Sequence, residues 1–121
     1  MEFSSAIEWN RALETVGGDR QLLRELMKVF IKDQQSLVTA IRNAATLKDG
    51  KDLKLRAHSI KGALNHLGAL HCAKLAARLE EMGNQNDFLE VENILNEFTE
   101  ALRPVAIEMN KFIDDIDYPG Q

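Results

Sequence analysis

The sequence predicts an all-α fold, an antiparallel up-down four-helix bundle with a short extra N-terminal helix. Three observations predict it. Glycine and proline are scarce, at 7 and 2 of 121 residues, whereas the helix formers leucine, alanine, glutamate and lysine abound. Apolar residues recur at steps of three and four, and no segment shows the sustained alternation of a strand. Short connections between the helical segments favour antiparallel neighbours.

The chain is long enough for one domain with its own core, and it shows no repeat or interdomain linker. We predict a single domain over residues 1–121, with the bundle over about 19–116 and a frayed tail over 117–121. A short first helix, over about 5–16, would begin at a capping box formed by Ser5 and Glu8. It would end at Gly17 and Gly18.

The second and third helices follow from their caps and apolar stripes. Asp19 can cap a long helix whose apolar positions are Leu22, Leu26, Val29, Phe30, Leu37, Ile41 and Ala44. The polar stretch 32–36 interrupts this stripe and makes the middle of the helix its weakest part. A turn at Asp49 and Gly50 leads to a third helix, which Gly68 ends. Its apolar positions are Leu53, Ala57, Ile60, Leu64 and Leu67.

The fourth and fifth helices complete the bundle. The fourth carries Cys72, Leu75, Ala76, Leu79 and Met82, and it is expected to stop at Gly83 and Asn84. The fifth has the most regular seam, formed by Phe88, Val91, Leu95, Phe98, Leu102, Val105, Met109, Phe112 and Ile116. Pro104 lies inside this seam and predicts a kink or a local break, because proline lacks a backbone donor and crowds the preceding turn.

Composition excludes several classes of function. The net charge of −4 argues against binding to nucleic acid or anionic membranes, both of which favour a basic surface. The chain has no apolar run of membrane-spanning length and no signal peptide. The single cysteine, Cys72, excludes an internal disulfide. We therefore expect a monomeric cytoplasmic protein.

One face of the third helix combines residue types suited to phosphoryl transfer. At about 100° per residue, His58 lies nearly opposite the apolar arc. The residues that share its side are Lys51, Lys54, Lys61, Gly62 and Asn65. A neutral histidine is a nucleophile near neutral pH, and the Lys61 ammonium can lie near a phosphoryl group on its ring. Gly62 costs helix stability but leaves room for a bulky partner.

A carboxylate on the fourth helix is a candidate partner for this histidine. His58 precedes Gly68 by about as many residues as Glu80 follows it, so an antiparallel hairpin brings the two to the same level. Glu80 would then accept a hydrogen bond from the far ring nitrogen and fix the tautomer. The alternative is a solvated glutamate in a helix C-terminal turn, and wheel geometry leaves both readings open.

Other residues near His58 favour docking over metal binding. His66 and His71 could join His58 in a metal site, but no acidic or thiol ligand completes a known spacing, so we predict none. Leu55 also falls near His58, and an apolar residue beside a catalytic candidate suits a docking surface. The predicted docking residues are Lys51, Lys54, Leu55, Asn65 and His66.

These residues resemble the histidine-containing phosphotransfer (HPt) domain of bacterial two-component phosphorelays. The resemblance rests on the stretch 57–62, Ala-His-Ser-Ile-Lys-Gly, on Leu67-Gly68-Ala69 and on Leu79-Glu80, and it extends to Gly17-Gly18-Asp19. It implies a four-helix bundle that displays His58 as the phosphoacceptor through Nε2, with Lys61, Gly62 and Glu80 in supporting roles. The chain departs from the family's small residues after the glycine, where it has Leu64, Asn65 and His66.

The resemblance also implies partners. The chain would take a phosphoryl group from the aspartate of one response-regulator receiver domain, or of a hybrid sensor kinase, and give it to another receiver. It has no glycine-rich phosphate loop, so it would have no ATP-dependent kinase activity and no cofactor of its own. The Mg²⁺ for the transfer would belong to the receiver.

Two other functions stay open on the sequence alone. The same motif resembles the phosphoacceptor domain of a chemotaxis-type histidine kinase, in which the donor would be ATP through a separate kinase domain. A helical adaptor that binds a partner without chemistry is the other alternative.

Overall fold

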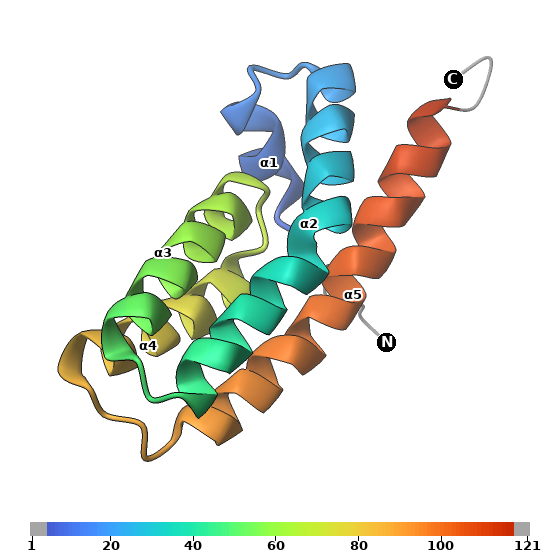
Figure 1. Ribbon diagram of the computed structural model, residues 1–121. Helices are drawn as coiled ribbons and strands as arrows, with labels where there is room; N and C mark the ends of the chain where they lie inside the picture. Colours follow the sequence, from blue (N-terminus) through green and yellow to red (C-terminus); the bar gives the residue numbers. More distant parts are fainter. Residues whose placement is uncertain (1–4, 118–121) are drawn as a thin grey trace.

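The computed structural model describes residues 5–117 and, within them, consists of five helices with no strand. The helices are α1 (Trp9–Thr15), α2 (Arg20–Thr46), α3 (Gly50–His66), α4 (Leu70–Gln85) and α5 (Val91–Asp117) (Figure 1). This confirms the all-α class. Residues 118–121 of the expected frayed tail lie outside the described residues, whereas Asp117 still belongs to α5.

Helices α2 to α5 form an antiparallel four-helix bundle. In it α3 packs against α2 and α4, and α5 packs against the same two helices from the other side. Helices α2 and α5 have 27 residues each and span roughly 40 Å, whereas α3 and α4 have 17 and 16. Helices α2 and α5 extend beyond α3 and α4, and α1 packs on this extension. There the Trp9 ring lies 5.1 Å from the ring of Phe112, centroid to centroid. Figure 1 shows α1 beside the free end of α2.

The first helix begins later than the sequence predicted. Its N-cap is Glu8, which makes no side-chain capping bond, so the capping box is wrong. The Ser5 hydroxyl instead hydrogen-bonds to the carboxylate of Glu108, and the Ala6 N–H donates to that carboxylate at 2.6 Å. The segment before α1 is thus tied to α5 by a contact with a residue about a hundred positions away. As predicted, the helix ends before Gly17 and Gly18, which have φ of +61° and +82°.

Helix α2 is continuous through the polar stretch 32–36, and it is capped by the Asp19 side chain, which accepts from the Leu22 N–H. Its buried stripe differs in part from the prediction. Phe30, Ile41 and Ala44 are buried as predicted. Leu23 and Met27 are also buried, whereas three residues assigned to the core are exposed: Leu22, Leu26 and Val29. The two sets lie next to each other on the helix, and the choice between them depends on where α1, α3 and α5 pack.

Helix α4 continues past the predicted stop at Gly83 to Gln85, and its C-cap is Asn86, which has the left-handed conformation. Gly83 is a contact residue, not a terminator. A Cβ atom on Gly83 would lie 2.6 Å from both the Gly50 oxygen and the Lys54 nitrogen. Gly50 likewise begins α3, after the Asp49 cap, and does not form the turn itself.

Helix α5 runs unbroken through Pro104, so the predicted local break at this residue is wrong. Pro104 and Glu100, whose carbonyl loses its helical partner, are both exposed, so water can satisfy that carbonyl. The buried seam of α5 follows the predicted spacing from Val91 to Phe112. Within residues 5–117, no helix has the length and apolar character needed to cross a bilayer.

Candidate functional site

His58 lies on the outer side of α3, where its side chain is 65% exposed. Its neighbours Ala57 and Ile60 are buried in the core, so the helix turns His58 away from the bundle. The surface beside it is open, because a Cβ atom added to Gly62 would meet nothing within 4 Å. The ring is therefore accessible to another protein, which phosphoryl transfer requires.

Glu80 on α4 contacts His58. The Glu80 Oε2 lies 2.9 Å from His58 Nδ1, and the other carboxylate oxygen, Oε1, lies 2.6 Å from the Lys61 Nζ. The Glu80 side chain is only 19% exposed, so it is not the solvated glutamate of the alternative reading. Counting residues from the turn at Gly68 thus predicted a contact that the structure contains. The role of Glu80 in phosphoryl transfer stays a prediction.

This contact determines which ring nitrogen of His58 carries the proton. An ionised carboxylate can only accept hydrogen bonds, so Nδ1 of His58 donates to Glu80. In the neutral ring Nε2 then has the free lone pair. That nitrogen is on the far side of the ring from Glu80, and its role as the nucleophile stays a prediction.

The ionised state of Glu80 is favoured by its partners. Partial burial raises the pKa of this carboxyl, but the hydrogen bonds and charges of Lys61 and His58 lower it more. The net pKa lies below the ordinary value for glutamate. The carboxylate therefore remains charged at neutral pH and can hold the Nδ1 proton.

The lowered pKa predicts a pH-dependent contribution to stability. A carboxyl whose pKa is lower in the folded chain stabilises the fold above its unfolded pKa, and this contribution is lost as the pH falls through the folded pKa. We expect Glu80→Gln to lower the free energy of unfolding at neutral pH, and the difference from wild type to shrink in acid. Urea unfolding at about pH 7 and about pH 3 measures both values. Glu97→Gln on the exposed surface of α5 is the control, and an equal pH dependence in both variants would contradict the assignment.

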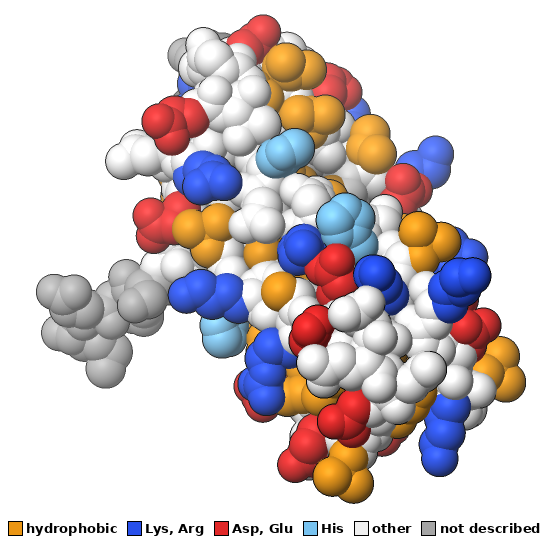
Figure 2. All heavy atoms as spheres, turned by 90° about the vertical axis from the view of Figure 1, so that its left-hand side faces the viewer, with side chains coloured by type: hydrophobic (Ala, Val, Ile, Leu, Met, Phe, Trp, Pro, Cys, Tyr) orange, Lys and Arg blue, Asp and Glu red, His pale blue; other side chains and the backbone are white. Residues whose placement is uncertain are grey.

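A surface depression of about 540 Å³, hereafter the His58 depression, lies in front of the ring. It is lined by Lys51, Lys54, Leu55, His58 and Glu80. Figure 2 shows this side of the molecule, where histidine, lysine and acidic side chains lie together. Three of the predicted docking residues therefore adjoin the phosphoacceptor candidate.

The other two docking candidates lie elsewhere. His66 is exposed and lines a second depression, of about 260 Å³, between α2 and α3, and Asn65 lines neither of the two. The second depression also contains Leu26 and Val29, which the sequence analysis placed in the core. The exposed fractions of Leu22, Leu26 and Val29 are 45%, 40% and 57%, and the three form an apolar strip on α2. The signal that could have revealed this exposed strip is the apolar pair Leu23 and Met27, which lines up with Phe30 in place of Leu22 and Leu26.

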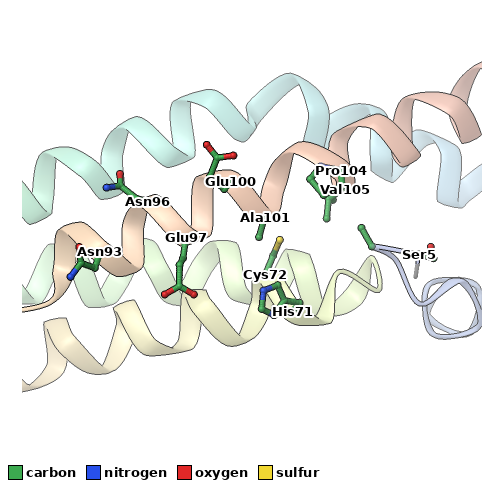
Figure 3. Close-up of a pocket in the computed structure, with 11 residues that line it drawn as sticks. Ser5, His71, Cys72, Asn93, Asn96, Glu97, Glu100, Ala101, Pro104 and Val105 are labelled. Atoms are coloured by element: carbon green, nitrogen blue, oxygen red, sulfur yellow. The ribbon is translucent and has the colours of Figure 1, made fainter. Parts of the chain in front are cut away.

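A larger hollow, of about 720 Å³, lies between α4 and α5. Figure 3 shows His71 and Cys72 of α4 at this hollow, opposite Glu97 and Ala101 of α5. His58 and His66 are not among its lining residues, so the three histidines do not converge. Burial raises the pKa of the Cys72 thiol to about 11, which makes it a poor nucleophile. Across residues 5–117, no three His, Cys, Asp or Glu side chains are grouped to hold a metal ion.

Comparison with known proteins assigns the family. A family model, the Hpt domain, matches residues 25–109, which is more than half of the chain and includes the whole site around His58. The chain belongs to the Hpt domain family. Membership gives it a histidine phosphotransfer role in two-component phosphorelays, and Hpt domains are phosphotransfer carriers that work with receiver domains and hybrid kinases.

Solved structures agree with the Hpt fold. The chain is similar to histidine-containing phosphotransfer protein B (HptB) from Pseudomonas aeruginosa PAO1, with a TM-score of 0.85 and 17% identity over 93% of this chain and 98% of that one. It is also similar to the HPT domain of a sensor hybrid histidine kinase from Shewanella, with a TM-score of 0.80 and 17% identity over 92% and 96% of the two chains. At this identity the likeness shows the fold alone. No curated protein matches the sequence.

Proposed function

We propose that His58 accepts a phosphoryl group on Nε2 from the aspartyl phosphate of a receiver domain and passes it to the aspartate of another receiver. The contact between His58 Nδ1 and Glu80 Oε2 carries this proposal. It places a proton acceptor on one side of the ring and leaves an exposed nucleophilic nitrogen on the other. An adaptor without chemistry has no need of this arrangement.

The transfer balances with these groups alone. The lone pair of Nε2 forms the new bond to phosphorus, and the bond from phosphorus to the aspartyl oxygen breaks, returning its electron pair to the carboxylate. The His58 ring keeps its Nδ1 proton and becomes cationic while Nε2 carries the phosphoryl group. The Glu80 carboxylate, held by Lys61, faces this new positive charge and stabilises it. The reverse sequence delivers the phosphoryl group to the next receiver.

The chain supplies no ATP chemistry in this scheme. The Mg²⁺ that offsets charge on the transferring group would belong to the receiver. The partners would be response-regulator receiver domains, including one attached to a hybrid sensor kinase.

The apolar strip of Leu22, Leu26 and Val29 supports a docking role for α2. These side chains are exposed on the helix next to α3, and Leu26 and Val29 share a depression with His66. Apolar side chains grouped beside a reactive residue are typical of a protein interface. The receiver would then bind across α2 and α3 with its aspartate over His58.

Val29→Glu is expected to weaken receiver binding at least about tenfold, because it places a charge in the apolar part of the interface. Calorimetric titration with a receiver that phosphorylates the wild type measures the affinity. Ile107→Glu is a matched control, since Ile107 is 62% exposed on α5, a helix that makes no contact with α3 among the described residues. Equal affinities for the two variants would place the docking surface elsewhere.

The proposal is tested by incubating the chain with receiver domains carrying a labelled aspartyl phosphate. Acid-labile, base-stable label on this chain is the expected result, because phosphohistidine has that stability. Absence of label with every receiver of the source organism would favour the adaptor. Label from a chemotaxis-type kinase and ATP, but from no receiver, would favour the phosphoacceptor domain of such a kinase.

A further inference from the structure

Three lysines surround His58 on α3, but only one of them is paired. The Lys61 Nζ is held at 2.6 Å by the Glu80 carboxylate, and its side chain is 27% exposed. Lys51 and Lys54 are exposed, and within residues 5–117 neither makes an ion pair or a side-chain hydrogen bond. The two free cations therefore differ from Lys61 in what they can bind.

The free lysines share the surface depression in front of the His58 ring. In a helix the bond from Cα to Cβ tilts toward the N-terminus, so a side chain covers the turn before its own residue. For His58 that turn contains Lys54 and Leu55. Both residues line the His58 depression together with Lys51, whereas Lys61 and Gly62 do not.

The cations near the ring therefore differ in whether a carboxylate already binds them. On the Nδ1 side are the Glu80 carboxylate and the Lys61 ammonium that neutralises it. The remaining wall of the depression carries two lysines and no acidic residue other than Glu80. A phosphoryl group on Nε2 is a dianion and requires cations that are not already bound to a carboxylate.

We propose that Lys54, supported by Lys51, forms the binding site for the phosphoryl dianion on His58, while Lys61 stays on Glu80 and holds that carboxylate against Nδ1. This inference rests on the proposed function and names the residues that receive its product. It reassigns Lys61 from the phosphoryl group, where the sequence analysis placed it, to the positioning of Glu80.

A small-molecule donor tests this site without a receiver. Phosphoramidate, whose nitrogen is protonated at neutral pH, is suitable: the Nε2 lone pair attacks phosphorus, the phosphorus–nitrogen bond breaks, and its electron pair leaves with neutral ammonia. Because no second protein is present, a lysine that acts only in docking does not affect this reaction. The variants are Lys54→Gln, Lys51→Gln and Lys61→Gln, with Lys111→Gln on α5 as the charge-matched control.

Lys54→Gln is expected to slow labelling about five- to tenfold, and Lys51→Gln to slow it less. In ³¹P spectra, Lys54→Gln should also raise the pH at which the phosphohistidine group takes up a proton, because a cation that favours the dianion is lost. Lys61→Gln should leave this ³¹P titration at its wild-type position and change the ¹⁵N shift of His58 Nδ1. Lys111→Gln should match wild type in every readout.

Two results would overturn the inference. One is a ³¹P titration that moves in Lys61→Gln and not in Lys54→Gln. The other is a Lys54→Gln variant that equals Lys111→Gln in rate and titration. If wild-type protein takes no label from either phosphoramidate or a phosphorylated receiver, the proposed function itself fails. Labelling of wild type with no effect of Lys54→Gln removes only the present inference.

Discussion

Replacing His58 with glutamine is expected to abolish phosphoryl transfer and to leave the bundle folded. The glutamine amide has no nucleophilic lone pair on nitrogen, so no covalent intermediate can form. The side chain at this position is 65% exposed and outside the core, so the free energy of unfolding should change by less than about 1 kcal/mol. Labelling from a phosphorylated receiver measures the first effect, and thermal unfolding followed by circular dichroism measures the second.

His71→Gln is the control for this experiment, because His71 is an exposed histidine on α4 that lines the hollow between α4 and α5, away from the proposed docking surface. This variant should take up label at the same rate and to the same final amount as wild type. Label on His58→Gln at the wild-type level would remove His58 as the acceptor. An unfolded His58→Gln variant would contradict the exposed position of the ring.

Gly83→Ala is expected to have the largest effect on stability, a loss of about 2–3 kcal/mol in the free energy of unfolding. The added Cβ would lie 2.6 Å from the backbone of both Gly50 and Lys54, and backbone atoms cannot move aside as a flexible side chain can. Helices α3 and α4 must then separate, one turn away from both His58 and Glu80. Urea unfolding measures the loss, and the Nδ1–H signal of His58 in proton NMR reports the contact with Glu80.

Gly62→Ala is the matched comparison, since it is the same substitution at a helical glycine of the same hairpin. Its Cβ would meet nothing within 4 Å, so the higher helix propensity of alanine should stabilise the chain by about 0.5–1 kcal/mol. Opposite signs for the two glycines are thus expected. A neutral Gly83→Ala variant would show that α3 and α4 are not in close contact at this level.

The helices and the site pair could be predicted from the sequence for a local reason. The heptad-like seam of α5 and the Asp19 cap each depend on residues only a few positions apart, so both can be recognised in a short stretch of sequence. Glu80 is not local, but the single turn at Gly68 joins two straight helices of similar length. Counting residues from that turn therefore brings Glu80 to the level of His58.

Other features depend on contacts that no local pattern contains. Ser5 could cap a helix, but it bonds instead to Glu108, and only the packed structure brings that carboxylate near. Gly83 resembles a helix terminator, yet its missing side chain serves the approach of α3. On α2 two adjacent stripes have similar hydrophobicity, and tertiary packing buries the stripe of Leu23 and leaves that of Val29 exposed.

The sequence also could not show which lysine pairs with Glu80. Lys61 and Lys54 both lie within one turn of His58, and a helical wheel cannot distinguish a cation bound to Glu80 from a free one. The difference comes from α4, which places the carboxylate on one side of the ring only. The separate roles proposed for the two lysines follow from that asymmetry.

The central claim is that His58 receives the phosphoryl group on Nε2 while Nδ1 keeps its proton against Glu80. Proton–nitrogen correlation NMR of the ¹⁵N-labelled protein, phosphorylated by a receiver, tests it most directly, because each ring nitrogen has its own signal. The expected spectrum shows phosphorus coupling at Nε2 of His58 and a protonated Nδ1. Coupling at Nδ1 of His58, or at a nitrogen of His66 or His71, would contradict the claim.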